Sequence, residues 1–325
     1  MSDDQTCPIE TIDPARMDRF ATGAVHDVMT RLRHEAPVHH TKDSVFGPYW
    51  SIARYKDIVE VEALPLLYSS EMSRGGISLI DSDFAAEPSE TQMETFIAMD
   101  PPRHTEKRRV VAPAFTPSEI ARLADSIRER TASKLDSLPR GETFNWTKEV
   151  SISLTTDMLA ILFDFPWEDR HKLTEWSDGL TNLELIREKP QERQMMMFEM
   201  AMKFYQLWQE RLEAEPTPDL LSRMIHSNAL SKMEQTEFIG NMALLIVGGN
   251  DTTRNSMSGL IDALNRWPEE WDKIKANPDL IPNAAQEIIR WQSPVNHMRR
   301  TVTKDHEFRG HQFREGDKVV LWYMS

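Results

Sequence analysis

Val247-Gly-Gly-Asn-Asp-Thr-Thr253 lies within one long apolar helical pattern and decides the fold of this chain. The pattern begins at Ser231, which forms a capping-box signature with Glu234 three residues later. It continues without proline until Pro268, which predicts a helix of roughly 35 residues, or about 50 Å. The residues before the glycine pair leave little polar face, so we expect the middle of this helix to be buried on all sides: Phe238, Ile239, Met242, Leu244, Leu245 and Ile246.

The glycine pair and the two polar residues after it are costly at the centre of a buried helix. Each glycine costs up to ~1 kcal/mol relative to alanine. Asp251 and Thr252 place polar groups in an interior where they need partners. We therefore expect the helix to open locally at Gly248-Gly249 and to present Asp251 and Thr252 to a small buried ligand.

Composition limits the class of protein. The 325 residues carry 38 basic and 52 acidic side chains, a net charge of −14 that argues against nucleic-acid binding. The sequence shows no signal peptide and no 18-residue apolar run, which predicts a soluble, cytoplasmic protein without a membrane span. The single cysteine, Cys7, excludes an internal disulfide and a cysteine-rich metal site. We expect residues 1–24 to form a polar leader and residues 25–325 a single domain.

Apolar residues recur at helical spacing through most of the chain after residue 25, which predicts a mainly α protein with small peripheral sheets. Besides the long helix, the predicted helices cover residues 25–34, 55–64, 103–112, 117–138, 148–163, 170–183, 191–213, 219–226 and 282–291. The predicted strands cover residues 37–40, 49–53, 300–303, 307–309 and 318–324.

An acidic segment and a methionine-rich segment each allow two interpretations, and the end of the sequence is unusual. Residues 77–102 contain no Lys or Arg and form either a functional acidic loop or an excursion of no consequence. A methionine-rich segment could line an adaptable pocket or be ordinary helix core: Met195, Met196, Met197, Met200 and Met202. The sequence stops inside an apolar strand pattern at residues 319–324, so we expect the chain to be C-terminally incomplete.

Two charged motifs come next. His104 and Arg108 are four residues apart at a helix start, so they share a face that suits a carboxylate, although a solvated basic face is the commoner explanation. Glu287 and Arg290 are three apart, and their apolar neighbours predict a buried ion pair that needs further partners. Arg300 opens a strand pattern and offers another cation. Gly-x-Ser-x-Gly, Walker and His-Glu-x-x-His motifs are absent from the sequence.

In this order, the motifs resemble the cytochrome P-450 superfamily of haem-thiolate monooxygenases. The resemblance covers the chain from about residue 25 and rests on His104-x-x-x-Arg108, Gly248-Gly-Asn-Asp-Thr-Thr253, Glu287-x-x-Arg290 and Arg300. Four further blocks are similar to the soluble bacterial branch that hydroxylates medium-chain alkanes at the terminal carbon: Phe46-Gly-Pro-Tyr-Trp-Ser51, Phe96-Ile-Ala-Met-Asp-Pro-Pro102, Phe163-Asp-Phe-Pro-Trp167 and Gly249-Asn-Asp-Thr-Thr-Arg-Asn-Ser-Met257.

The resemblance implies heme b as cofactor and assigns roles to these residues. His104, Arg108 and Arg300 would bind the haem propionates, and Glu287 and Arg290 would form a structural ion pair. Gly248 and Gly249 would let the long helix pass close over the haem. Thr252 would hydrogen-bond on the oxygen-binding side, and Asp251 would feed protons to it from solvent.

The resemblance also implies partners, and the sequence departs from the family pattern in one respect. The family's haem-ligating cysteine follows the strand at which this sequence stops, so we expect no metal ligand in this chain and no activity from it alone. The apolar wall facing an alkane or fatty acid would include Leu244, Leu245, Val247, Val295 and Met298, which could equally be ordinary core. Electrons would come from a ferredoxin and an NADH-dependent ferredoxin reductase, docked near Arg103, Lys107 and Arg109. The alternative function is a non-catalytic helical protein that binds a lipid or terpene.

Overall fold

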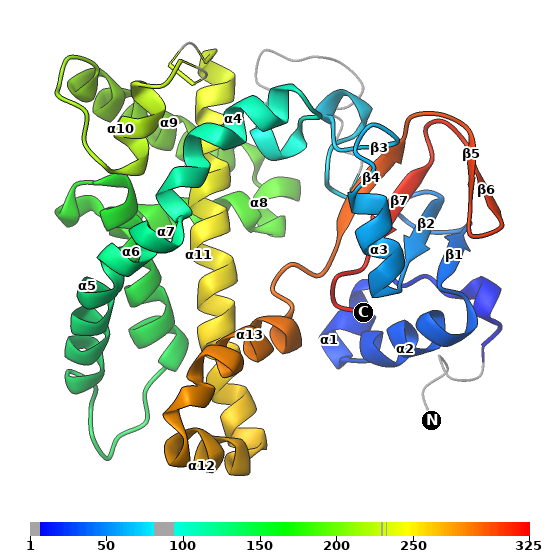
Figure 1. The fold of residues 1–325 in the computed structure, drawn as a ribbon, viewed down its shortest axis with the longest axis horizontal. Coiled ribbons are helices and arrows are strands. Elements are labelled where there is room, and N and C mark those ends of the chain that lie inside the picture. The colour runs from blue at the N-terminus through cyan, green and yellow to red at the C-terminus, as the bar shows by residue number, and fades with distance from the viewer. Residues whose placement is uncertain (1–6, 81–93, 229, 232) are drawn as a thin grey trace. The chain divides into compact units, whose positions relative to one another are not determined.

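The computed structural model describes residues 7–80 and 94–325, apart from residues 229 and 232. Packing divides the chain into two compact units. The first, here called the sheet unit, contains Met1–Gln92, Ile97–His104 and Val295–Ser325. The second, the helical unit, contains Met93–Phe96 and Thr105–Pro294. Both are drawn in Figure 1.

The sheet unit is built on a five-stranded sheet with the order β1-β2-β7-β4-β3. Strands β2 and β7 pair in parallel, whereas the other neighbours are antiparallel. The strands are β1 (Val38–Thr41), β2 (Tyr49–Ile52), β3 (Tyr68–Ser69), β4 (Met298–Val302) and β7 (Lys318–Leu321), with a separate hairpin of β5 (His306–Phe308) and β6 (His311–Phe313). Each predicted strand is confirmed with shifted ends, while β3 and β6 were not predicted.

Both faces of this sheet are covered by apolar side chains. Along β7, Val320 faces one core and Val319 the other, because successive side chains of a strand point to opposite sides. The first core contains Leu32 of α2 (Val25–Glu35), and the second contains Ile58 of α3 (Tyr55–Glu62). The C-terminal strand pattern is therefore buried within the sheet unit.

The boundary expected at residue 24 does not match the packing. Ile12 is fully buried in the same core as Leu32, and α1 (Met17–Thr22) follows it. Asp13 accepts hydrogen bonds from the Tyr49 hydroxyl at 2.6 Å and the Ala15 amide at 3.0 Å. The described part of this segment is thus a structural part of the sheet unit, since Ile12 and Ala15 are buried and Asp13 is hydrogen-bonded.

The helical unit is arranged around one long central helix, α11 (Gln235–Arg266), drawn in yellow in Figure 1. Helices α6, α7, α9, α12 and α13 all pack on it. The other helices of the chain are α4 (Arg103–Val111), α5 (Pro117–Asp136), α6 (Ser153–Phe163), α7 (His171–Thr181), α8 (Leu183–Arg187), α9 (Pro190–Leu212), α10 (Leu220–Ile225), α12 (Pro268–Ala276) and α13 (Ile281–Gln292). A π-helical turn, Thr147–Ile152, leads into α6.

The long helix differs from its prediction in three ways. It begins at Gln235 after a Glu234 that makes no side-chain cap, because Ser231 belongs to the preceding turn, where its amide bonds to the carbonyl of Ser227 at 3.1 Å. The backbone stays α-helical through the glycine pair, so the expected local opening is wrong. Burial on all sides is also wrong, since Gly248 is exposed while Asn250 is fully buried.

Other predictions on helices have mixed outcomes. Proline at 268, taken as a stop, also begins α12, because proline suits the first turn of a helix. In α9, Met200 is fully buried but Met195 is 74% exposed, so the methionines combine core and surface positions. Half of the predicted acidic loop, residues 81–93, lies outside the described residues.

Candidate functional site

The two glycines of α11 have different surroundings. A Cβ atom on Gly249 would lie 2.7 Å from Cδ2 of Leu159, so Gly249 allows α6 to pack closely on α11. A Cβ atom on Gly248 would meet nothing within 4 Å. Leu244, Gly248 and Thr252 are four residues apart and share this open face of the helix. The pair therefore serves two purposes, helix packing at Gly249 and an open face at Gly248.

Thr252 is tied to this open face by its own helix. Its hydroxyl donates a hydrogen bond to the carbonyl oxygen of Gly248 at 2.8 Å. Because the hydroxyl proton is used in this way, the oxygen is left with acceptor capacity. The side chain is thereby oriented as an acceptor beside the glycine.

Asp251 lies in a polar network between α11 and α7. Its Oδ1 accepts a hydrogen bond from the Ser177 hydroxyl at 3.1 Å and pairs with Nη2 of Arg254 at 2.9 Å. The other guanidinium nitrogen of Arg254 contacts Oδ1 of Asp178 at 2.6 Å. Burial raises the pKa of the Asp251 carboxyl above its ordinary value, and Arg254 opposes this shift. The network leads from the part-buried Asp251 to a half-exposed Asp178.

Sequence reasoning missed the contribution of α7 to this network. The signal available was Arg254, which is three residues after Asp251 and therefore on the same helix face. Ser177 and Asp178 come from a helix remote in sequence, and no local pattern places them beside Asp251.

The predicted anion-binding cations are placed in different environments. His104 is part-buried in the sheet unit, whereas Arg108 is exposed in the helical unit. Nη2 of Arg300 contacts Oε1 of Glu62 at 2.9 Å, and the Tyr323 hydroxyl donates to the same oxygen at 2.5 Å. Arg300 is therefore engaged with a carboxylate of its own unit.

Arg299, the neighbour of Arg300, was not among the predicted site residues. It is buried, and its Nη2 donates to the carbonyl oxygen of Arg74 at 3.2 Å and to the Thr301 hydroxyl at 3.3 Å. The two arginines point to opposite faces of β4, because side chains alternate along a strand. Strand parity could have indicated that only one of them reaches a given ligand.

The Glu287–Arg290 pair is confirmed, but its predicted burial is wrong. The two groups form paired contacts of 2.6 and 2.7 Å, and Arg290 lowers the pKa of the Glu287 carboxyl. Their side chains are 61% and 69% exposed, respectively. The flanking Ile289 is itself half-exposed, and Ile288 is the buried residue of this helix. Apolar neighbours in the sequence therefore did not ensure burial.

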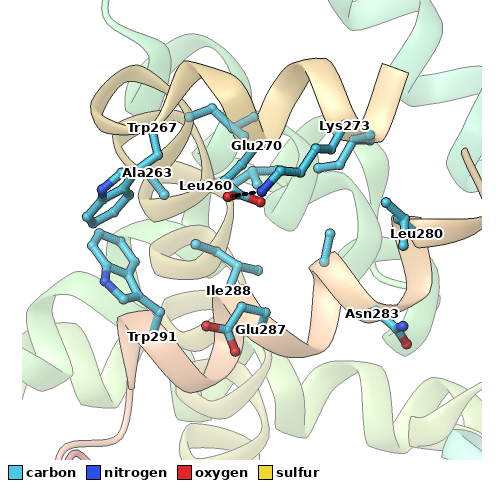
Figure 2. Close-up of a pocket in the computed structure, with 13 residues that line it drawn as sticks. Leu260, Ala263, Trp267, Glu270, Lys273, Leu280, Asn283, Glu287, Ile288 and Trp291 are labelled. Carbon is cyan, nitrogen blue, oxygen red and sulfur yellow. Dashed lines mark hydrogen bonds and ion pairs between the residues drawn. The ribbon is translucent and has the colours of Figure 1, made fainter. Parts of the chain in front are cut away.

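Glu287 borders a cavity of about 600 Å³ formed by α11, α12 and α13. Figure 2 shows Trp267 and Trp291 facing one another at one end of this cavity, with Ile288 beside Glu287. The ring centroids of Trp267 and Trp291 are 5.6 Å apart in an edge-to-face arrangement. A second cavity, of about 400 Å³, lies among α5, α6 and α11 and is lined in part by Gly249 and Thr253.

The expected substrate wall belongs to both units. Leu244, Leu245 and Val247 are part-buried in the helical unit, whereas Val295 and Met298 belong to the sheet unit. The first three come from the same helix segment as Gly248. Their partial exposure fits a lining role better than a place deep in the core.

The expected docking surface was wrong at Lys107. Its amino group pairs with the carboxylate of Glu237, and both side chains are largely buried. Lys107 therefore joins α4 to the start of α11 and is not part of a solvated basic face. Arg103 pairs with Glu71 at 3.4 Å, and Arg109 is exposed.

Within the described ranges, no group of three or more His, Cys, Asp or Glu side chains is placed to hold a metal ion. Cys7 packs against the core of the sheet unit, where Nη1 of Arg31 donates to its carbonyl oxygen at 3.1 Å. None of the described helices has the length and apolar character needed to cross a membrane.

Comparison with known proteins identifies the family. No family model matches the chain. The structure of cytochrome P450-153 from Novosphingobium aromaticivorans is 46% identical, with a TM-score of 0.88 over 96% of this chain and 78% of that one. The chain belongs to the cytochrome P450 superfamily. CYP153D17 from Sphingomonas sp. PAMC 26605 is 51% identical, with a TM-score of 0.89 and the same coverage.

A further relative is linalool 8-monooxygenase of Pseudomonas putida. It is 33% identical over 323 residues, which are 98% of this chain and 79% of that protein. The mainly helical P450 fold predicted from the sequence is thereby confirmed. As a P450 monooxygenase, this chain belongs to enzymes that use haem, O₂, a redox partner and a hydrophobic substrate.

Proposed function

We propose that this P450 hydroxylates medium-chain alkanes or fatty acids at the terminal carbon, with electrons from a cytoplasmic ferredoxin and its NADH-dependent reductase. The observation that carries the proposal is the Asp251–Thr252 pair beside the open face at Gly248. The part-buried Leu244 and Val247 on the same helix segment supply apolar surface. An alkyl chain is recognised by such a surface through shape alone.

The residues present fit heme b on the open face of α11. Gly248 leaves room for a flat ring system, because a Cβ there would point into open space. When bound with a thiolate ligand, haem supplies the activation of O₂ for insertion into a C–H bond. His104 and Arg108 are the candidates for its propionates. Arg300 is the third candidate, and it would have to exchange Glu62 for a propionate.

Asp251 and Thr252 would carry out proton transfer at this face of α11. The Thr252 oxygen accepts a hydrogen bond from a proton donor there, since its own proton is given to Gly248. The raised pKa of Asp251 brings its carboxyl nearer to neutral pH, where proton exchange is most efficient. Arg254 links it to Asp178, which is open to solvent and can be recharged there.

The experiment that tests this function is product analysis with matched substrates. The protein that carries the haem-ligating cysteine is loaded with haem, supplied with ferredoxin, reductase and NADH, and offered dodecane or dodecanoate. We expect 1-dodecanol or 12-hydroxydodecanoate as the main product, whereas residues 1–325 alone should give no thiolate-type Soret band in the carbon monoxide difference spectrum. Hydroxylation confined to internal carbons, or binding of both substrates without any product, would contradict the proposal.

A further inference from the structure

The outward face of α9 carries a row of exposed apolar side chains, here called the outer seam. Its members are between 48% and 74% exposed: Met195, Phe198, Met202, Tyr205 and Leu212. The opposite face of α9 already packs into the helical unit through the buried Met200, Phe204 and Leu207. A surface helix normally places polar side chains on its outward face, and a contiguous exposed apolar patch of this kind marks an interaction site.

The spacing of the outer seam indicates which kind of partner fits it. Its positions are alternately three and four residues apart once the exposed Gln209 is included. This alternation averages 3.5 residues per turn and is the pattern by which one helix packs along another in a left-handed coiled coil. A lipid surface or a flat protein surface requires no such period. The seam is therefore suited to a second helix.

The outer seam is also complementary to itself. Its midpoint lies between residues 203 and 204. A two-fold axis at that midpoint would place the side chains of two antiparallel copies opposite one another in three pairs: Met202 with Tyr205, Phe198 with Gln209, and Met195 with Leu212. A two-fold interface needs a patch that matches itself in this way. The helix that fits the seam best is thus α9 of a second copy.

A hollow beside the midpoint supports the antiparallel arrangement. It has a volume of about 420 Å³ and is lined by Met202, Tyr205, Trp208, Ser231, Met233 and Phe238. The rings of Trp208 and Phe238 meet edge to face there, with centroids 4.8 Å apart. Phe198 of the second copy would lie opposite Gln209, next to Trp208, and could enter this hollow as a knob enters a hole. Aromatic side chains seated in pockets contribute most of the binding energy at interfaces.

Charge and area both allow two copies to meet at this face. Glu199, beside the seam, is paired with Lys172 at 2.6 Å, and Glu210 accepts a hydrogen bond from Gln206 at 2.8 Å. These contacts moderate the repulsion between copies that each carry a net charge of −14. With side chains of about 200 Å² each, the seam exposes on the order of 600 Å² per copy, which reaches the lower end of specific interfaces.

We propose that the protein forms a two-fold symmetric dimer in which the outer seams of two copies pack antiparallel. All residues of the interface belong to the helical unit. The dimer goes beyond the proposed function and does not depend on the substrate. An interface at the lower end of the size range predicts a dimer that dissociates on dilution.

Sedimentation equilibrium of the haem-loaded protein that carries the haem-ligating cysteine tests this dimer. Between about 1 and 100 µM, the wild type should pass from monomer to dimer, because dimerisation follows mass action. Phe198→Ala should weaken the dimer about tenfold or more, and Met202→Glu should remain a monomer. The matched control is Leu135→Glu, at a similarly exposed apolar residue of α5, which should dimerise as the wild type does. A monomeric wild type, or equal effects of Met202→Glu and Leu135→Glu, would overturn the proposal.

Disulfide trapping tests the orientation of the two helices. In a Cys7→Ser background, a mixture of Met195→Cys and Leu212→Cys chains should form cross-linked dimers that neither variant forms alone, because only opposed positions come within disulfide distance. Cross-linking within each variant alone, and not between them, would show parallel helices and contradict the two-fold arrangement. A monomeric wild type that binds phosphatidylcholine vesicles, with binding lost in Met202→Glu, would assign the seam to a lipid surface and overturn the dimer.

Discussion

At the scale of single residues, Thr252 is the side chain whose role is most directly testable. Thr252→Ala removes the acceptor oxygen beside Gly248 but little apolar surface. In the protein that carries the haem-ligating cysteine, we expect substrate binding to persist while electrons from NADH are diverted to hydrogen peroxide. The measurement is the ratio of product to NADH consumed, with a peroxide assay. Thr253→Ala is the matched control, because Thr253 lines the separate cavity among α5, α6 and α11. Equal coupling in the two variants would remove the assignment.

Asp251 gives a pH-dependent prediction of stability. Its pKa is raised in the folded state, so the folded protein binds this proton more tightly than the unfolded chain does. This contribution to stability is complete below the ordinary value of 3.8 and is lost as pH rises through the folded pKa. Asp251→Asn mimics the protonated group at every pH. The free energy of unfolding of the variant, relative to wild type, should therefore increase from acid to neutral pH in urea titrations. A relative decrease would mean that Arg254 outweighs burial.

At the scale of elements, the glycine pair of α11 offers a comparison within one helix. Gly248→Ala and Gly249→Ala gain the same helix propensity, so the difference between them reports packing. The new methyl group at position 249 would collide with Leu159, whereas that at 248 meets no atom. We expect Gly249→Ala to be the less stable variant by about 1–3 kcal/mol in chemical unfolding. Equal stabilities would show that α6 shifts at no cost.

Haem binding should also differ between these two variants, but here Gly248→Ala should be the more strongly affected. An added methyl group at position 248 lies on the open face, so Gly248→Ala should bind haem more weakly while folding normally. Haem titration followed by absorbance measures this effect. Normal haem uptake by Gly248→Ala, with a loss in Gly249→Ala, would place the haem on the face of α11 that contains Gly249 and would contradict the proposal.

Elements also show how far the sequence alone could lead. The central helix, most helices and five strands followed from periodicity, because each is long or regular enough to carry a pattern. The burial and the contact partners of individual residues were harder to predict from the sequence. Glu287 and Arg290 proved exposed because α13 buries mainly Ile288, and Arg300 proved to face Glu62 because of strand parity. Such outcomes depend on neighbours remote in sequence, as does the pairing of Asp251 with Ser177 of α7.

At the scale of the whole molecule, charge limits how an electron donor can dock. The chain has a net charge of −14, so an acidic ferredoxin needs a local basic surface to approach it. Lys107 is removed from such a surface by its largely buried pair with Glu237. Arg109, two residues further along α4, is exposed and remains available. The expected docking surface is therefore smaller than the sequence suggested and depends strongly on Arg109.

Arg109→Glu tests this surface through the rate of reduction by ferredoxin. The reversal should slow reduction at low salt, and the difference from wild type should shrink as salt screens the charges, because steering acts on encounter. Arg128→Glu changes the net charge equally at an exposed site on α5 and should have a smaller effect. Lys107→Glu, by contrast, would place two acids together in a largely buried site and lower the melting temperature. Equal slowing by Arg109→Glu and Arg128→Glu would mean that the donor responds to net charge and does not dock at α4.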